Sequence, residues 1–256
     1  MLVSDVPPTL EQTLSGSQRV VEERQLESGI SGLRLGALKA VALSYGTQAG
    51  YARRAFEIRQ EVQGQAAHLN KVYDFDGLIL ERNVLPPVLV EATNTLALTG
   101  SDTLRLSDHT YQVVTQARFV TAAPTWRDYL INGIAVTWAQ PDLSLTPRDA
   151  NEQRYWESQV KAGWAAGVQQ ADQVFQAQLA RLTRDYKGMV LYRHLLTRNM
   201  VSKPFVAESN LGVTGDGGQI AINDRILRIT ALPQLETRSE QWKAKLVPSR
   251  STPVGK

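Results

Sequence analysis

Residues with side chains suited to catalysis or metal binding are few and scattered. The chain has three histidines, His68, His109 and His194, and no cysteine. None of the histidines belongs to a metal-binding motif such as HExxH. The lack of cysteine excludes disulfides, thiol catalysis and zinc sites built on thiolates. The sequence therefore predicts no catalytic residue, no cofactor-binding residue and no metal ligand, and the protein is expected not to be an enzyme.

Other polar patterns in the sequence also do not amount to a catalytic, metal-binding or phosphate-binding site. Asp74 and Asp76 are two residues apart, and such a carboxylate pair could bind a metal or share a proton. No third ligand lies near them in the sequence. His109 beside Asp108 is interpreted as the chemistry of a turn. The glycine-rich segment GVTGDGGQ resembles a phosphate loop, but no Lys-Ser/Thr closes it, so a mobile loop is predicted.

Composition and charge narrow the classes of protein that remain. The 256 residues are 43% hydrophobic and 21% charged, which is ordinary for a globular protein of one or two domains. The net charge of +3 is small, and no dense basic stripe with interleaved aromatic residues indicates nucleic-acid binding. Neither a long uncharged apolar segment nor a signal-peptide pattern is present. The chain is then either cytosolic or a mature form whose export signal was removed.

Two long helices are predicted from apolar periodicity. The first runs from Ser28 to about Asn70, and glycines spaced by four at Gly32/Gly36 and Gly46/Gly50 permit close approach of a neighbouring helix, with a possible break near Gly46. The second begins at Thr146, an N-cap hydroxyl followed by proline. Its stripe from Trp156 to Tyr186 is typical of a core rather than of a cofactor site.

Two hairpins are predicted after the helices. Apolar residues alternate around the polar turns Ser107–His109 and Asn223–Arg225. Before the first of them, the run LPPVLVEA, Leu85 to Ala92, is either a linker that crosses the core or an exposed docking edge.

The two helix–hairpin segments also resemble each other at a fixed offset. The matched pairs are Arg82-Asn83 with Arg198-Asn199, Asn94 with Asn210, Asp108 with Asp224, Trp126 with Trp242, and Leu130 with Leu246. No gap is needed. Either the chain contains an internal duplication, or two hairpins are similar by coincidence.

These patterns together predict an α+β fold, with long helices, short antiparallel β-hairpins and two related halves. A flexible lead is expected over residues 1–18 and a flexible tail over residues 248–256. Between them, residues 19–247 are expected to form a single folded body, with halves at about 28–140 and 146–247.

Several unusual strings in this order resemble one family. They are NVLPPVLVEATNTL, the hairpin at Thr110-Tyr111, ARFVTAAPTWRDYL and TPRDANEQRYWESQVKAGWAAGVQQA. They resemble the DotC family, outer-membrane lipoproteins of type IVB secretion systems and of IncI-type conjugation systems, over roughly residues 25 to 245. Family members carry a lipoprotein signal and a lipid-bearing first Cys. This sequence has neither, so a mature region made without them, or a replaced start, is expected.

The resemblance implies a structural role without enzyme activity or cofactor. It implies a ring-forming component at the periplasmic face of the outer membrane, attached there by an N-terminal lipid. There it would work with a DotD-like lipoprotein to recruit and place a DotH-like subunit of the core complex. The alternatives are a periplasmic cell-wall-processing enzyme and a DNA- or peptide-binding module of the same transfer system.

Overall fold

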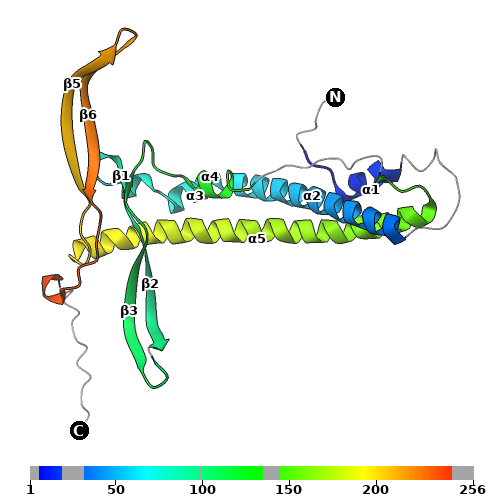
Figure 1. The fold of residues 1–256 in the computed structure, drawn as a ribbon, viewed down its shortest axis with the longest axis horizontal. Helices are drawn as coiled ribbons and strands as arrows, with labels where there is room; N and C mark the ends of the chain where they lie inside the picture. The colour runs from blue at the N-terminus through cyan, green and yellow to red at the C-terminus, as the bar shows by residue number, and fades with distance from the viewer. Residues whose placement is uncertain (1–5, 19–31, 99, 135–144, 244–256) are drawn as a thin grey trace. The chain divides into compact units, whose positions relative to one another are not determined.

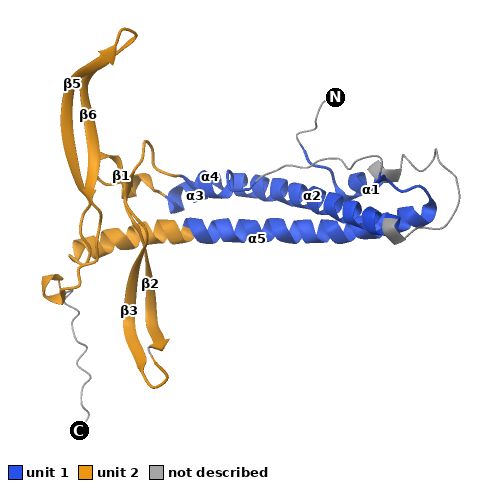
Figure 2. Ribbon diagram, viewed as in Figure 1, with its two compact units in different colours: residues 1–73, 125–182 blue, residues 74–124, 183–256 orange. Residues whose placement is uncertain are grey.

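The fold is described from a computed structural model over residues 6–18, 32–98, 100–134 and 145–243. It combines long helices with two-stranded antiparallel sheets (Figure 1), so the predicted α+β class is confirmed. The chain forms two compact units, residues 1–73 with 125–182 and residues 74–124 with 183–256 (Figure 2). Each unit draws segments from both predicted halves. The single folded body over residues 19–247 stays a prediction.

The first unit is helical. It contains α1 (Leu10–Gln18), α2 (Gly32–Gly64), α3 (Ala66–Val72), α4 (Trp126–Leu130) and α5 (Ala150–Thr197) as far as Leu182. None of the helices that the structure describes has the length and apolar character needed to span a bilayer.

Glycines bring α2 and α5 into backbone contact. A Cβ atom added at Gly46 would overlap the carbonyl of Val160, and one at Gly50 would overlap the backbone of Trp164. Two glycines of α5 do the same in return, because Gly163 lies against Leu43 and Gly167 against Thr47. The predicted close approach is confirmed at Gly46 and Gly50, whereas a Cβ at Gly36 would meet nothing within 4 Å. The predicted break near Gly46 is wrong, since α2 continues to Gly64.

The core of this unit is aromatic at one end and thinner in the middle. Trp156 and Val160 are fully buried and pack with Leu38, Ala42 and Tyr45 of α2. Farther along the predicted stripe of α5, Leu182 is buried, but Trp164, Val168, Phe175 and Leu179 are only half-buried. The interpretation as core is therefore confirmed for Trp156, Val160 and Leu182 rather than for the whole stripe, since Tyr186 is also only half-buried.

The start of α5 is capped differently from the prediction. The Oδ1 atom of Asp149 accepts hydrogen bonds from the backbone N–H groups of Asn151 and Glu152, each at 2.8 Å. Asp149, not Thr146, is therefore the N-cap, because its carboxylate reaches the unpaired amides of the first turn. Glu152 forms a bidentate ion pair with Arg34 of α2, at 2.7 and 2.8 Å.

The short helix α4 begins with a capping box formed by Thr125 and Asp128. Thr125 donates from its backbone N–H to Asp128 at 2.7 Å, and its side chain bonds the same carboxylate. The indole N–H of buried Trp126 donates to Asn70 at 2.7 Å. The Trp-Arg-Asp-Tyr-Leu segment is thus anchored beside the end of α3.

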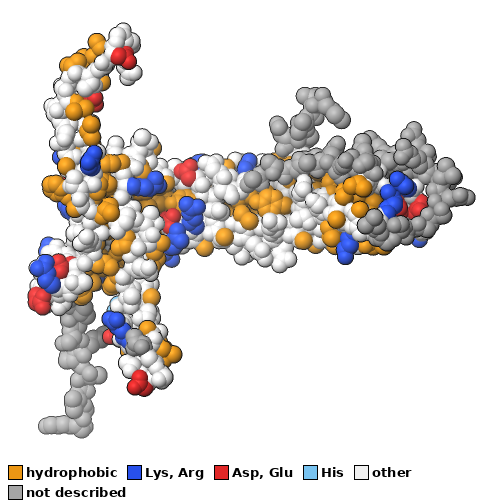
Figure 3. Space-filling view, viewed as in Figure 1, with side chains coloured by type: hydrophobic (Ala, Val, Ile, Leu, Met, Phe, Trp, Pro, Cys, Tyr) orange, Lys and Arg blue, Asp and Glu red, His pale blue; other side chains and the backbone are white. Residues whose placement is uncertain are grey.

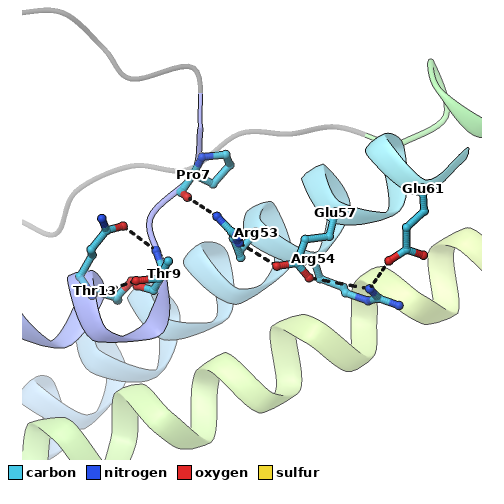
Figure 4. Close-up of polar contacts among 8 residues, drawn as sticks. Pro7, Thr9, Thr13, Arg53, Arg54, Glu57 and Glu61 are labelled. Carbon is cyan, nitrogen blue, oxygen red and sulfur yellow. Dashed lines mark hydrogen bonds and ion pairs between the residues drawn. The ribbon is translucent and has the colours of Figure 1, made fainter. Parts of the chain in front are cut away.

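Part of the predicted lead is ordered on α2. Residues Leu10–Gln18 form α1, in which the Thr13 side chain is buried. Arg53 donates to the carbonyl of Pro7 at 3.5 Å and to Glu57 at 2.7 Å (Figure 4). Its neighbour Arg54 pairs with Asp172 of α5 at 2.8 Å, so both arginines are held by hydrogen-bonded partners. The predicted tail over residues 248–256 lies outside the described residues.

The second unit carries three separate two-stranded antiparallel sheets. β1 (Val84–Leu85) pairs with β4 (Arg118–Phe119), β2 (Val88–Leu98) with β3 (Leu104–Thr115), and β5 (Phe205–Asp216) with β6 (Gln219–Ala231). Short 3₁₀ helices η2 (Asp76–Leu78), η3 (Glu81–Asn83) and η5 (Ser239–Gln241) flank them, and the unit includes α5 from Thr183 onward. The residues from Val84 to Leu89 are buried, which confirms the core-crossing interpretation of LPPVLVEA over that part.

The hairpins are longer than predicted, and their turns lie elsewhere. Asp108 is within β3, and Asp224 is within β6. The second turn is Gly217-Gly218, with Asp216 paired to Gln219 across it. The glycine-rich segment interpreted as a mobile loop is therefore the end of β5 and this turn. The turn predictions were wrong because polar residues on an exposed ribbon alternate with apolar ones without marking a bend.

Candidate partner-binding surface

The histidines and aspartates considered as catalytic residues or metal ligands lie on different elements. His68 lies in α3, His109 in β3 and His194 near the end of α5. Within the described ranges no three His, Asp or Glu side chains are grouped so that they could hold a metal ion. Asp74 accepts a hydrogen bond from the backbone N–H of Gly77 at 3.3 Å, and Asp76 begins η2. In this geometry Asp74 shapes a turn before the hairpins.

One polar cluster on β2–β3 joins a histidine to a carboxylate. The Nδ1 atom of His109 lies 2.8 Å from Oε1 of Glu91, and the Tyr111 hydroxyl donates to the same oxygen at 3.0 Å. The His109 and Tyr111 rings are nearly parallel, 6.3 Å apart. Burial and the bond to Glu91 raise the pKa of Tyr111. Cross-strand pairs of this kind stabilise a ribbon, and this cluster is the best candidate for chemistry among the described residues.

The roots of both hairpins are held by one core. Tyr192 and Leu195 of α5 are buried with Leu89 of β2 and with Val201, which precedes β5. Partly buried side chains from the same unit complete the cluster: Leu80, Tyr111, Val113, Leu191, Leu196, Met200 and Leu235. The Tyr192 hydroxyl donates to the carbonyl of Ser202 at 3.2 Å, and burial raises its pKa to about 12.

A glycine of α5 lets the first ribbon lie against this helix. A Cβ at Gly188 would overlap the backbone of Leu89 and the side chain of Val88. Nearby, the Phe75 and Tyr186 rings meet edge to face with centroids 5.2 Å apart. The strand root and the helix are therefore packed at backbone distance, so the start of the ribbon is firmly placed.

A series of ion pairs, Arg82–Glu208–Arg225, connects the residues before β1 to the β5–β6 hairpin. Arg82 and Asn83 adopt left-handed backbone, with φ of 62° and 56°. From there Arg82 donates to the carbonyl of Val206 at 2.9 Å and lies 3.6 Å from Glu208. Glu208 also pairs with Arg225 across the ribbon at 3.1 Å. Asn199 has the same left-handed backbone as Asn83, at φ 58°, so the asparagines of the matched Arg-Asn pairs share this feature, whereas the arginines do not.

A hollow of about 510 Å³ lies beside Arg82. Its basic lining comes from Arg82, Arg193 and Lys203, and Phe205 forms part of its wall with its side chain 65% exposed. Arg193 also donates to the carbonyl of Gly77. Glu81 also lines the hollow, so cations, one carboxylate and an aromatic face meet there.

Most of the exposed large apolar side chains of the described residues lie on the two long hairpins, and Figure 3 shows hydrophobic side chains at the surface of the helices as well. Those on β2–β3 are Leu96, Leu98, Leu104, Leu106 and Val114; those on β5–β6 are Phe205, Leu211, Val213, Ile220, Ile222, Ile226 and Leu227. Scattered exposed apolar residues are normal, but contiguous groups mark interaction sites. The ribbons are therefore the surface on which a partner is expected.

Comparison with known families agrees with a role in transfer. Residues 32–244 match the family described as type IV secretory system, conjugal DNA-protein transfer. The match covers most of the chain, and the protein belongs to this family. Among individually curated proteins, no sequence matches the chain.

Proposed function

We propose that the protein is a structural subunit of the envelope complex of a type IV secretion or conjugation system. In this proposal it acts at the periplasmic face of the outer membrane, as a lipid-anchored component of a ring. It works with a DotD-like lipoprotein to place a DotH-like subunit. It acts by assembly and performs no reaction of its own.

The observation that carries the proposal is the pair of apolar ribbons in a member of a conjugal-transfer family. Ribbons with firmly packed roots and exposed aliphatic strands suit docking, since exposed apolar patches of this kind mark protein interfaces. The resemblance of residues 25 to 245 to the DotC family supports the finer assignment to the outer membrane and to these two partners. The basic hollow beside Arg82 adds a second contact surface.

The test is the position of the DotH-like subunit in cells with and without this chain. Deleting the gene should abolish transfer and shift the DotH-like subunit out of the outer-membrane fraction, and the intact gene should restore both. If the DotH-like subunit keeps its place in the deletion strain, the assembly role is wrong.

The enzymatic alternative is tested at the polar cluster of β2–β3. Glu91→Gln and His109→Ala remove the carboxylate and the imidazole that any hydrolase chemistry there would need. An assembly subunit should retain transfer with either substitution, provided that its level in the cell is unchanged. Loss of transfer with normal ring assembly would favour an enzyme instead.

A further inference from the structure

The hollow beside Arg82 is lined by three separate segments of the hairpin unit. They are residues 79–82 before β1, Arg193 and Leu196 of α5, and residues 203–206 at the start of β5. Its volume of about 510 Å³ falls within the range of about 300–1,000 Å³ that is usual for ligand sites in proteins. Because the lining comes from segments far apart in the sequence, the hollow depends on the folded unit.

Much of the lining is apolar. Its half-buried apolar members are Ile79, Leu80, Leu196, Pro204 and Val206. Phe205, the first residue of β5, adds an aromatic ring and is 65% exposed. Aromatic side chains are enriched at protein interfaces, where they serve as anchors. An occupant that covers Phe205 therefore has to supply an apolar side chain of its own.

The charged lining is mainly positive. Three cations, Arg82, Arg193 and Lys203, line the hollow with one carboxylate, Glu81, which leaves a net charge of +2. Opposite charges attract most strongly where water is partly excluded. The hollow therefore favours an anionic occupant, with its negative charge near the cations and away from Glu81.

Lys203 is the cation that remains available to an occupant. Arg82 and Arg193 each donate to a backbone carbonyl of the same unit, so both guanidinium groups are held in place. In the part of the chain that the structure describes, no side-chain hydrogen bond or ion pair involves Lys203. Its ammonium group is exposed, two residues before Phe205. A charged contact and an apolar contact therefore lie side by side at the start of β5.

The backbone that carries Arg82 is unusual. Arg82 and Asn83 both have positive φ, 62° and 56°, a conformation that residues with side chains adopt infrequently and at a cost in free energy. Backbone strain of this kind gathers at functional sites. Here the bend brings Arg82 within hydrogen-bonding distance of Val206 in β5, and so joins two of the three segments that line the hollow.

We infer that the hollow binds an extended segment of a partner protein in which an acidic side chain stands next to an apolar one. The acidic side chain pairs with Lys203, and the apolar side chain packs on Phe205. The inference rests on the proposed function in one respect, since a subunit that acts by assembly binds other polypeptides. It adds the chemistry of the bound segment, which the proposed function leaves open.

Two carboxylates make nucleic acid a poorer occupant. Glu81 lines the hollow, and Glu208 lies 3.6 Å from Arg82. A nucleic-acid strand carries a phosphate at every nucleotide, and proteins bind it with dense patches or stripes of cations. Glu81 and Glu208 would repel such a row of phosphates. An acidic peptide has fewer charges and can place one carboxylate at Lys203 alone.

Selection from a random peptide library displayed on phage tests this chemistry without assuming a sequence. The full wild-type chain is the bait, and the Lys203→Glu variant is used to remove peptides that bind elsewhere, after circular dichroism has verified that both are folded. Peptides that bind only the wild type should be enriched in Asp or Glu adjacent to Leu, Ile, Val or Phe. Enrichment of basic or uncharged peptides, or of none, would contradict the inference.

Fluorescence anisotropy with the best selected peptide then assigns the site. Lys203→Ala and Phe205→Ser should each weaken binding by about tenfold or more, because each removes one of the two contacts. Glu81→Gln should strengthen binding, since it removes a like charge. Changing the acidic residue of the peptide to its amide should weaken binding to the wild type and cause little further loss with Lys203→Ala.

Matched controls come from exposed residues of the same unit that do not line the hollow. Lys187→Ala on α5 and Ile226→Ser on β6 should leave the affinity for the peptide unchanged. If they weaken binding as much as the Lys203 and Phe205 variants do, the peptide binds outside the hollow and the inference is wrong.

Two competitors distinguish other occupants. Displacement of the peptide by an equal concentration of oligothymidylate would assign the hollow to nucleic acid. Displacement by sodium phosphate, beyond that caused by sodium chloride of equal ionic strength, would assign it to small anions. Either result would overturn the inference, and resistance to both supports it. The position of the DotH-like subunit in cells tests the proposed function separately, so the two can fail independently.

Discussion

The helical unit and the hairpin unit treat their apolar residues in opposite ways. In the helical unit, glycines draw α2 and α5 together until backbone meets backbone, and Trp156 is completely buried. In the hairpin unit, only the roots of the ribbons are packed, and the tips leave leucine and isoleucine in solvent. The comparison indicates that stability comes mainly from the helices and the roots, and that the exposed ends of the hairpins contribute little to it.

The sharpest test of the helical side is Trp156→Ala. This substitution should lower the free energy of unfolding by about 3–5 kcal/mol, because it removes a fully buried aromatic side chain and leaves a cavity. Chemical unfolding followed by circular dichroism measures the loss. Phe175→Ala is the matched control, and it should cost less because Phe175 is half-buried. Equal losses would mean that the core is not concentrated near Trp156.

A glycine substitution examines the backbone contact directly. Gly167→Leu should cost about 1–3 kcal/mol, because its side chain would have to push α5 away from the backbone of Thr47 and Tyr51. Gly36→Ala is the control in α2, where a Cβ meets nothing within 4 Å, and it should raise stability by up to about 1 kcal/mol through helix propensity. Thermal unfolding of both variants and of the wild-type protein measures these changes in stability. A tolerated Gly167→Leu would contradict the close contact.

The sequence was informative where local chemistry alone determines the structure. Glycines four residues apart implied the close helix contact that the structure shows at Gly46 and Gly50. The N-cap of α5 was predicted at Thr146 instead of Asp149. Both residue types are good N-caps, and the choice between them depends on where Arg34 holds Glu152.

The hairpin turns show more clearly what the sequence pattern cannot predict. Alternation around Ser107–His109 is the same whether a turn or a straight exposed strand lies there, so the pattern could not locate the bend. The aliphatic faces at the ends of the hairpins were missed for a related reason. Their signal, alternating Leu96/Leu98 and Leu104/Leu106 about a Gly-Ser-Asp turn, is present, but only the cross-strand register shows that these side chains meet on one face.

The ion pair at the start of α5 predicts an acid-sensitive contribution in the helical unit. The hydrogen bond and charge of Arg34 hold the pKa of Glu152 below its usual value, despite the opposing effect of burial. The stabilisation is fully present above the ordinary Glu pKa of about 4.3 and is lost as the pH falls through the lowered pKa. Glu152→Gln should cost about 1.5–3 kcal/mol at neutral pH. It should also flatten the pH dependence of stability below about pH 4.3. If the pH dependence of stability in acid is unchanged in the Glu152→Gln variant, the Arg34–Glu152 pair does not cause it.

At the roots of the hairpins, Tyr192→Phe should have a smaller effect. It removes the hydrogen bond to Ser202 while keeping the buried ring, at a cost of about 0.5–1.5 kcal/mol. Burial raises the Tyr192 pKa to about 12, so its contribution is present below the ordinary Tyr pKa of about 10 and declines as the pH rises from there toward 12. Unfolding measured between neutral and alkaline pH should show a shallower decline in the variant. The same decline in both proteins would argue against a buried hydroxyl.

The smallest expected effect on the monomer is at the tips. Leu106→Ser and Ile222→Ser change side chains that are 69% and 75% exposed, so each should alter the free energy of unfolding by no more than about 0.5 kcal/mol. Ala97→Ser and Ala221→Ser, on the opposite faces of the same two hairpins, should change it as little. A loss of several kcal/mol in the Leu106 or Ile222 variant would show that these ends of the hairpins are buried within one molecule, and the contrast between a packed helical unit and exposed hairpin ends would then fail.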